Sequence, residues 1–224
     1  VGALKAYALA VDFAGTLYMA GDFTNAGGTT VNQIAYWAGG SFGSMTGGII
    51  GLSPTGYALA VEPSGRLAVT GRFAIAGAGS AFGIAEWNGA QFSALGSGLR
   101  SLASGGTGMY VRTIVADQAT GDLYAGGVFG SAGAFKVSDG GARWNGYAWL
   151  PLDIDVAANN SGTFNAFALA PDRTLYAGGT FAGTAQAAAV AQIVNTGMGE
   201  AYPTIRVRTT SSGTARLYQM VNTL

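Results

Sequence analysis

The stretch Leu17-Tyr18-Met19-Ala20-Gly21-Asp22-Phe23 decides the fold, because the chain repeats it three times. The later copies read LAVTGRF at 67–73, LYAGGVF at 123–129 and LYAGGTF at 175–181. Their shared glycines, Gly21, Gly71, Gly127 and Gly179, are separated by 50, 56 and 52 residues. Self-similarity at a period of this length predicts an array of similar supersecondary units.

Three more strand-like segments accompany each full copy. An apolar segment precedes the stretch, reading AYALAVD at 6–12, GYALAVE at 56–62, VRTIVAD at 111–117 and FNAFALA at 164–170. A turn rich in Gly, Pro and Asp joins the two segments, which predicts a hairpin. A third segment ends at Trp37, Trp87 and Trp144, and a fourth begins near the aromatic residues Phe42, Phe92 and Trp149. Four strands in such a unit are typical of a propeller blade, so we expect an all-β chain, a β-propeller of about four four-stranded blades.

The fourth copy departs from this pattern. Val194 lies near the place of the repeated tryptophan, and PTIRVRTTSSGTARLYQMVN at 203–222 alternates like a strand hairpin around a Ser-Ser-Gly turn. We expect propeller repeats over 1–200, divided at about 1–50, 51–108, 109–163 and 164–200. Residues 201–224 are expected to form a cap or the start of a C-terminal β-sandwich or jelly-roll module. Two arrangements stay open: four blades that close by themselves, and further blades before Val1.

Composition excludes several classes of function. Eleven basic and eleven acidic residues leave no net charge to attract nucleic acid or an anionic membrane. The absence of Cys and His removes disulfides, thiol nucleophiles, imidazole or thiolate metal sites, and catalytic triads that need histidine. No apolar run approaches the length of about 18 residues that a membrane-spanning helix needs. We therefore expect no catalytic residue, cofactor, metal, nucleic-acid partner or membrane insertion.

The repeats resemble a known family through two motifs. The second copy shows them best, with IAEWNG at 84–89 and FSALGSG at 92–98 following the Gly-x-Phe stretch. Together these motifs resemble the kelch-like propeller repeats of large secreted proteins, fungal cell-polarity markers and phage tail proteins. The segment at 203–222 resembles the opening of a jelly-roll module that follows such repeats in some phage tail proteins. The copper chemistry of galactose oxidase, another kelch-type propeller, implies histidine and a cysteine-modified tyrosine, and this chain has neither.

Candidate binding residues lie where the copies differ. Asp22 and Arg72 occupy the variable place between Gly and Phe. Solvated or mutually paired side chains on a strand are expected there, with an ion pair between blades or a ligand contact as the alternatives. The loops at 24–33, 74–83, 130–142 and 182–189 vary in length and content, which is typical of binding loops. Polar residues of these loops complete the candidate ligand-binding set: Asn25, Asn32, Lys136 and Asp139. We interpret the repeated tryptophans as core residues between blades, with stacking on a sugar as the alternative.

These features favour a non-enzymatic structural or receptor-binding component of a phage tail or a similar extracellular assembly. Its loops are expected to face other subunits of a tail or surface assembly, or a host-surface glycan, and a homo-oligomer is compatible with the low charge. The expected location is a virion or the extracellular surface of a cell. The alternatives are a secreted or surface-attached bacterial adhesion module and a carbohydrate-active enzyme, although no pair of carboxylates is marked by its spacing.

Overall fold

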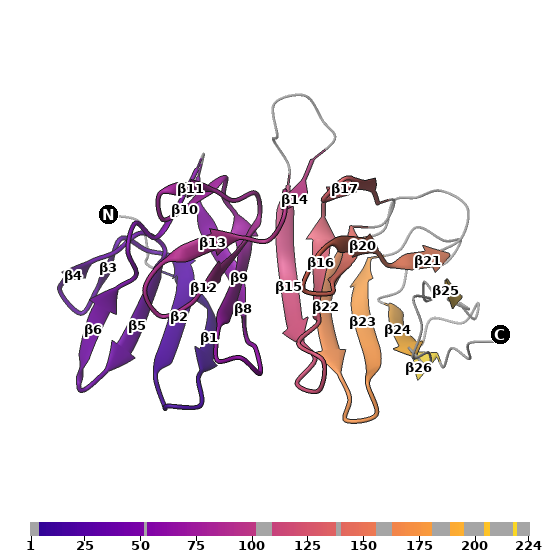
Figure 1. Ribbon diagram of the computed structural model, residues 1–224, viewed down its shortest axis with the longest axis horizontal. Coiled ribbons are helices and arrows are strands. Elements are labelled where there is room, and N and C mark those ends of the chain that lie inside the picture. The colour runs from indigo at the N-terminus through magenta and orange to yellow at the C-terminus, as the bar shows by residue number, and fades with distance from the viewer. Residues whose placement is uncertain are drawn as a thin grey trace.

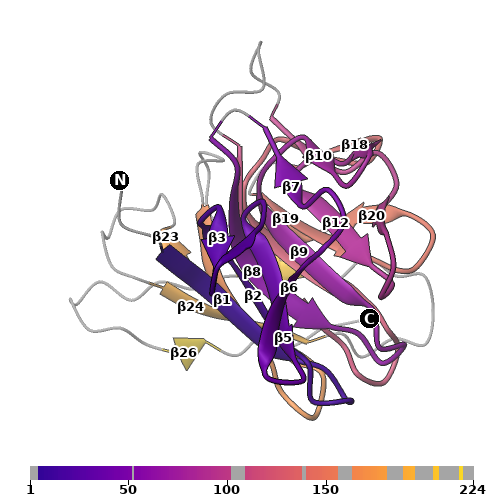
Figure 2. The ribbon, with the colours of Figure 1, turned by 90° about the vertical axis from the view of Figure 1, so that its left-hand side faces the viewer.

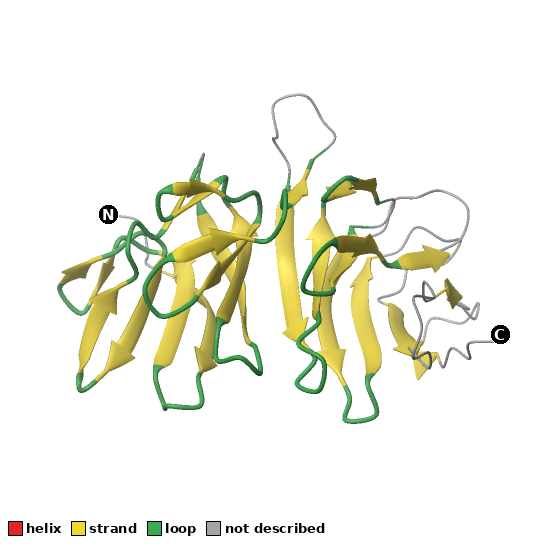
Figure 3. Ribbon diagram, in the orientation of Figure 1, coloured by secondary structure: helices red, strands yellow, loops and turns green. Residues whose placement is uncertain are grey.

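The computed structural model describes residues 5–51, 53–101, 109–137, 140–155, 163–180, 189–194, 204–206 and 217–218. Throughout these residues the chain is all-β and contains no helix, with strands joined by short loops (Figure 3). The strands form several small sheets whose pairings are mainly antiparallel, which confirms the predicted all-β class.

Four four-stranded sheets carry the repeat. The first contains β1 (Lys5–Val11), β2 (Leu17–Asp22), β5 (Ile34–Ala38) and β6 (Ser41–Ser44). The second contains β8 (Thr55–Val61), β9 (Leu67–Arg72), β12 (Ile84–Trp87) and β13 (Phe92–Ala94). The third contains β15 (Tyr110–Ala116), β16 (Leu123–Val128), β19 (Gly141–Trp144) and β20 (Trp149–Pro151). The fourth contains β22 (Thr163–Leu169), β23 (Thr174–Thr180), β24 (Ala189–Val194) and β26 (Leu217–Tyr218).

The first three sheets have the predicted strand order, because their strands pair in the sequence in which the chain makes them. All these pairings are antiparallel, and the third and fourth strands bring their aromatic residues opposite one another. The ring centroids are 4.8 Å apart for Trp37 and Phe42, and 4.9 Å apart for Trp87 and Phe92. The tryptophan and aromatic motifs of the sequence therefore form cross-strand pairs that fix the register.

The loops after the second strands contain short hairpins, which the sequence pattern did not predict. These hairpins pair β3 (Asn25–Ala26) with β4 (Thr29–Thr30), β10 (Ile75–Ala76) with β11 (Gly79–Ser80), and β17 (Ser131–Ala132) with β18 (Phe135–Lys136). Two strands that follow the fourth strand of the preceding sheet, β7 (Ile49–Ile50) and β14 (Leu99–Arg100), pair with β10 and β17. Backbone hydrogen bonds thus link one sheet to the hairpin of the next.

The C-terminal segment does not form the expected hairpin within the described residues. Its strand β25 (Thr204–Arg206) pairs in parallel with β21 (Asp153–Asp155), and β26 pairs in parallel with β24. The two short strands therefore add to different sheets instead of pairing with each other. The division of the chain at residue 200 stays a prediction.

A β-bulge in each first strand explains the repeated glycine. The register of the first and second strands shifts once per copy, beside Tyr7, Tyr57, Arg112 and Asn165. Next to the bulge, a Cβ atom on the repeated glycine would overlap a backbone carbonyl oxygen of the first strand in all four copies. Glycine at this place therefore permits the two strands to approach each other closely.

The four sheets stack side by side in chain order (Figure 1), and their first strands β1, β8, β15 and β22 lie next to one another. We call the face that carries Leu67, Val69 and Trp87, or their equivalents, the leading face. The opposite face, which carries Ala60 and Ala68 or their equivalents, is the trailing face. Each internal interface packs the leading face of one sheet against the trailing face of the sheet before it.

Most of the apolar core lies in these interfaces, and a smaller buried cluster of Phe23, Ala26, Val31 and Ala35 packs within the first repeat. Between the second and third sheets, Ala68 packs in one cluster with Leu123 and Trp149. The indole Nε1 of Trp149 also donates a 2.8 Å hydrogen bond to the carbonyl oxygen of Leu95. Between the third and fourth sheets, the amide of Phe167 donates to Thr113 Oγ1 at 2.9 Å. These two hydrogen bonds pair buried polar groups of neighbouring sheets.

The stack is an open row. The first sheet lies at one end of the molecule and the fourth at the other (Figure 1), and Figure 2 looks along the row from the end of the first sheet. Within the described residues the four sheets do not close into a ring, so each end of the row presents one sheet face without a neighbouring sheet.

Candidate functional site

The six sequence-predicted binding residues do not come together in one site. Asp22 is exposed at the end of β2, and Lys136 is exposed on β18. The side chains of two others support local loop structure: Asn25 Oδ1 accepts a hydrogen bond from the Gly28 amide, and Asn32 Nδ2 donates to the Gly47 carbonyl oxygen, each at 3.0 Å. Asp139 lies outside the described residues.

Arg72 does take part in a larger arrangement. Its guanidinium carbon lies 5.4 Å from the centroid of the Tyr110 ring, which belongs to the following sheet. The Tyr110 ring is 6.2 Å from that of Tyr57, and the Tyr57 ring is 5.8 Å from that of Tyr7. Arg112 lies over Tyr110 at 5.8 Å.

These residues form a continuous row, which we call the inner-strand ladder: Tyr7, Tyr57, Tyr110, Arg72, Arg112 and Asn165. The ladder reaches all four sheets, because Arg112 Nη1 donates a 3.0 Å hydrogen bond to Asn165 Oδ1 on β22. Burial raises the pKa of the Tyr57 hydroxyl, which therefore stays a protonated hydrogen-bond donor. Aromatic rings beside guanidinium groups suit a ligand that is rich in hydroxyl groups or carries negative charge.

The bulges supply four of the six members of this ladder. Tyr7, Tyr57, Arg112 and Asn165 are the bulge residues of their first strands, and a bulge redirects the side chain of its extra residue. Because the first strands are neighbours in space, the redirected side chains follow one another from sheet to sheet. The sequence identified Arg72, but the other members could be found only from the register.

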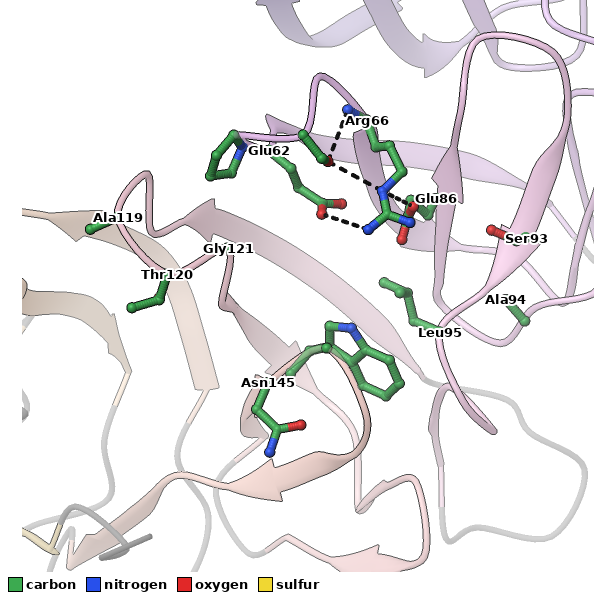
Figure 4. A pocket seen from close by; sticks show the side chains of 14 residues that line it. Glu62, Arg66, Glu86, Ser93, Ala94, Leu95, Ala119, Thr120, Gly121 and Asn145 are labelled. Atoms are coloured by element: carbon green, nitrogen blue, oxygen red, sulfur yellow. Dashed lines mark hydrogen bonds and ion pairs between the residues drawn. The ribbon is translucent and has the colours of Figure 1, made fainter. Parts of the chain in front are cut away.

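A second feature is a cavity of about 510 Å³ between the second and third sheets. One wall carries the charged side chains of Glu62, Arg66 and Glu86 (Figure 4). The third sheet lines the cavity with uncharged residues, among them Gly121 and Trp144. This volume is in the range of small-molecule sites, and convergent polar groups are typical of such sites.

The guanidinium of Arg66 lies near two buried carboxylates in this wall, those of Glu62 and Glu86. Arg66 Nε lies 2.6 Å from Glu86 Oε1, whereas Arg66 Nη2 lies 3.9 Å from Glu62 Oε2. The side chains of Glu62 and Glu86 are only 7% and 6% exposed. Glu62 Oε1 is buried and has no hydrogen-bond partner among the described residues.

The pKa values reflect this arrangement. Burial raises the pKa of Glu62 to about 7, repulsion from Glu86 adds to the increase, and the attraction of Arg66 opposes it. Burial also raises the pKa of Glu86, again against the effect of Arg66. A buried carboxylate favours its protonated form when a neighbouring cation compensates its charge only weakly, and Glu62, 3.9 Å from Arg66, is in this position near neutral pH.

In the first and third copies, the carboxylate that is equivalent to Glu62 has hydrogen-bond partners, whereas the fourth copy has Ala170 at this position. Asp12 accepts hydrogen bonds from the Ala14 and Thr16 amides and from the Tyr18 hydroxyl. Asp117 accepts one from the Ala119 amide and a 2.6 Å ion-paired one from Arg173 Nε. Although burial acts to raise them, these hydrogen bonds lower the pKa values of Asp12 and Asp117.

The second copy differs at two positions, that of the carboxylate and that of the neighbouring tyrosine. It has the longer Glu62 where the first and third copies have Asp12 and Asp117, and Ala68 in place of the tyrosine that stands at 18, 124 and 176. Sites where one copy breaks a rule that its neighbours keep are expected to be functional or strained. The sequence shows the two differences, but the pairing of the carboxylates could be assigned only from the structure.

The comparisons with known proteins identify no family for this chain. No family model matches the sequence, and no curated protein matches it. Among the described residues, no three Asp, Glu, His or Cys side chains are grouped as a metal site would require. The same part of the chain contains no helix that is long and apolar enough to cross a membrane.

Proposed function

We propose that this protein is a non-enzymatic structural and receptor-binding component of a phage tail or a similar extracellular assembly, built from kelch-like blades of a β-propeller. The four-stranded sheets, stacked through their first strands, support the propeller architecture. The tail location rests on the sequence resemblance. The observation that carries the role in an assembly is the uncovered leading face of the first sheet.

This face is apolar and open. Leu9 and Val11 are 64% and 59% exposed, and Trp37 is 39% exposed. The equivalents of Leu9 and Trp37 in later sheets, Ile114 and Trp87, are only 5% and 6% exposed because the preceding sheet covers them. Contiguous apolar surface of this kind marks an interaction site.

The other end of the row supplies a matching surface. Ala166 and Ala168 are exposed on the trailing face of the fourth sheet, whereas the equivalent Ala60 is packed under the third sheet. A second copy placed head to tail would repeat the contact that the chain makes at each internal interface. Two copies would bring together eight sheets, within the known range of propeller blades.

Leu9→Asp tests this role. We expect the 224-residue chain to self-associate, and the variant to be monomeric, because a charge on the leading face opposes burial there. Light scattering after size-exclusion chromatography measures the masses. Tyr147→Asp is the matched control, since Tyr147 is 91% exposed on a turn away from this face. A monomeric parent chain, or an unchanged mass for Leu9→Asp, would contradict the assembly role.

The inner-strand ladder is the proposed receptor surface. Tyr57 has aromatic neighbours on both sides, at 5.8 and 6.2 Å, so Tyr57→Ala interrupts the ladder. We expect affinity for a host glycan identified on a glycan array to fall about tenfold, as the loss of a stacking ring implies. Tyr147→Ala, which removes an exposed ring outside the ladder, should bind as the parent does. If no glycan binds the assembled protein, the ladder is not a glycan receptor.

A further inference from the structure

At the interface between the third and fourth sheets, an arginine of one sheet forms an ion pair with an aspartate of the other. Arg173, from the turn that enters the fourth sheet's second strand, lies with Nε 2.6 Å from Asp117 Oδ2. Arg173 has a φ of +66° at a turn position where the other copies have glycine, with φ of +81° at Gly121. The amides of Arg173 and Gly121 make the same turn hydrogen bond, to the carbonyl oxygens of Ala170 and Asp117. The two positions are therefore equivalent.

At the interface between the second and third sheets, no arginine occupies the position that is equivalent to Arg173. Glu62 stands where Asp117 stands one copy later, and Gly121 stands in the place of Arg173. A Cβ atom built on Gly121 would meet no heavy atom within 4 Å, so the space beside it is open. The cavity of about 510 Å³ occupies this region, and Glu62 Oε1 is unpartnered.

We propose that this cavity binds a guanidinium group, which lies between Glu62 and Gly121 as the Arg173 guanidinium lies beside Asp117. A planar guanidinium supplies several N–H donors in a fork that matches a carboxylate. The group can come from a small guanidinium compound or from an arginine side chain of a partner. This inference does not depend on the assembly or on the glycan surface proposed above.

The charges of the cavity favour a cation. Its charged lining groups are Glu62 and Glu86, which are acidic, and Arg66, which is basic. The wall from the third sheet contributes no titratable group, since it consists of Ala119, Thr120, Gly121, Trp144, Asn145 and Gly146. Arg66 is closer to Glu86 than to Glu62, so Glu62 is the carboxylate that an added cation would neutralise. The indole of Trp144 adds a ring of the kind that attracts a guanidinium.

Titration calorimetry with methylguanidinium at pH 8 tests the site. N-methylurea has a similar planar shape and no charge, so it separates charge recognition from a fit of shape. We expect saturable binding of methylguanidinium, no binding of N-methylurea, and at least tenfold weaker binding in Glu62→Gln. Because protonation of Glu62 removes its charge, methylguanidinium should bind more weakly at pH 6. Equal binding of the two compounds, unchanged binding in Glu62→Gln, or no binding of any guanidinium would overturn the proposal.

Gly121→Arg tests the same idea from within the chain. The new side chain is expected to occupy the cavity as Arg173 occupies its own site, and so to abolish binding of methylguanidinium. Gly15→Arg is the control for the left-handed backbone, because Gly15 has φ +85° at the same turn position and lies outside the cavity. Full binding by a folded Gly121→Arg variant would overturn the proposal. If Gly121→Arg does not fold, the binding measured for Glu62→Gln tests the proposal instead.

A tripeptide Gly-Arg-Gly distinguishes the two sources of the guanidinium. Tighter binding of the tripeptide than of methylguanidinium assigns the cavity to an arginine side chain of a partner. Binding of methylguanidinium alone assigns it to a small compound. Either result supports a guanidinium site, provided that Glu62→Gln weakens the binding.

Discussion

Gly71→Ala is expected to lower the free energy of unfolding by about 4 kcal/mol or more, which places it among the most damaging single substitutions. A Cβ atom at this position would overlap the carbonyl oxygen of Thr55 and lie against the Cα of Gly56. Both are backbone atoms of the paired strand, so no side-chain rotation relieves the contact. The strand is also held from its other side, because the Gly71 amide donates to the Gly83 carbonyl oxygen at 3.1 Å.

Gly79→Ala is the matched control for this prediction. Gly79 lies in a strand of the same copy, its φ is not in the left-handed region, and the nearest atom to an added Cβ is 4.0 Å away. We expect its effect to stay within about 0.5 kcal/mol, as for ordinary surface positions. Urea unfolding followed by tryptophan fluorescence measures both variants. Similar midpoints for the two would show that the bulge has room for a methyl group in solution.

The sequence predicted the strands well because their signals are local. The repeated glycine and the turn residues act within one sheet, and they appear in the structure as the bulge contact and the hairpin turns. The spaced aromatics form pairs across neighbouring strands of one sheet, although Trp87 and Trp149 also pack between sheets. The hairpins after the second strands were missed because each strand in them is only two residues long. Such strands have no periodic pattern of their own.

The candidate sites depend on contacts between copies, which local signals do not contain. Arg72 could be singled out because it differs from its equivalents, but its position over Tyr110 depends on how the next sheet packs. Four members of the inner-strand ladder are placed by a one-residue shift in register, which moves side chains from one face to the other. Tyr110 joins them because the first strands of neighbouring sheets lie side by side. The burial of Glu62 and the open space beside Gly121 are likewise properties of the stacked sheets.

The second large effect is expected on the pH dependence of stability. The pKa of Glu62 rises from 4.5 in the unfolded chain to about 7 in the folded protein. The folded state therefore binds this proton more tightly, and the free energy of unfolding falls as the pH rises from about 4.5 to 7. The full loss above this range is about 3 kcal/mol, because one pKa unit corresponds to about 1.4 kcal/mol. The chain has no histidine, so few other side chains titrate in this window.

Glu62→Gln should remove most of this dependence. We expect the variant to be more stable than the parent at pH 8 and to differ little from it at pH 5, measured by urea unfolding at both values. Glu86 also has a raised pKa, but it is present in both proteins, so their difference reports Glu62. Asp117→Asn is the control of opposite sign, since the loss of a buried, ion-paired carboxylate should destabilise the protein at pH 8. Equal stability of Glu62→Gln and the parent at pH 8 would contradict a raised pKa of Glu62 in the folded protein.

The same measurement connects stability to binding. A cation that pairs with ionised Glu62 stabilises the folded state selectively, so saturating Gly-Arg-Gly should reduce the loss of stability between pH 5 and pH 8. Gly121→Arg should reduce it without any ligand, because its side chain supplies the cation within the chain. Gly15→Arg, which carries the same charge away from the cavity, should leave the parent's pH dependence in place. Ionised Glu62 thus destabilises the protein without ligand at neutral pH and makes the cavity selective for a cation. Both the loss of stability and the binding of the cation should disappear when Glu62 is replaced.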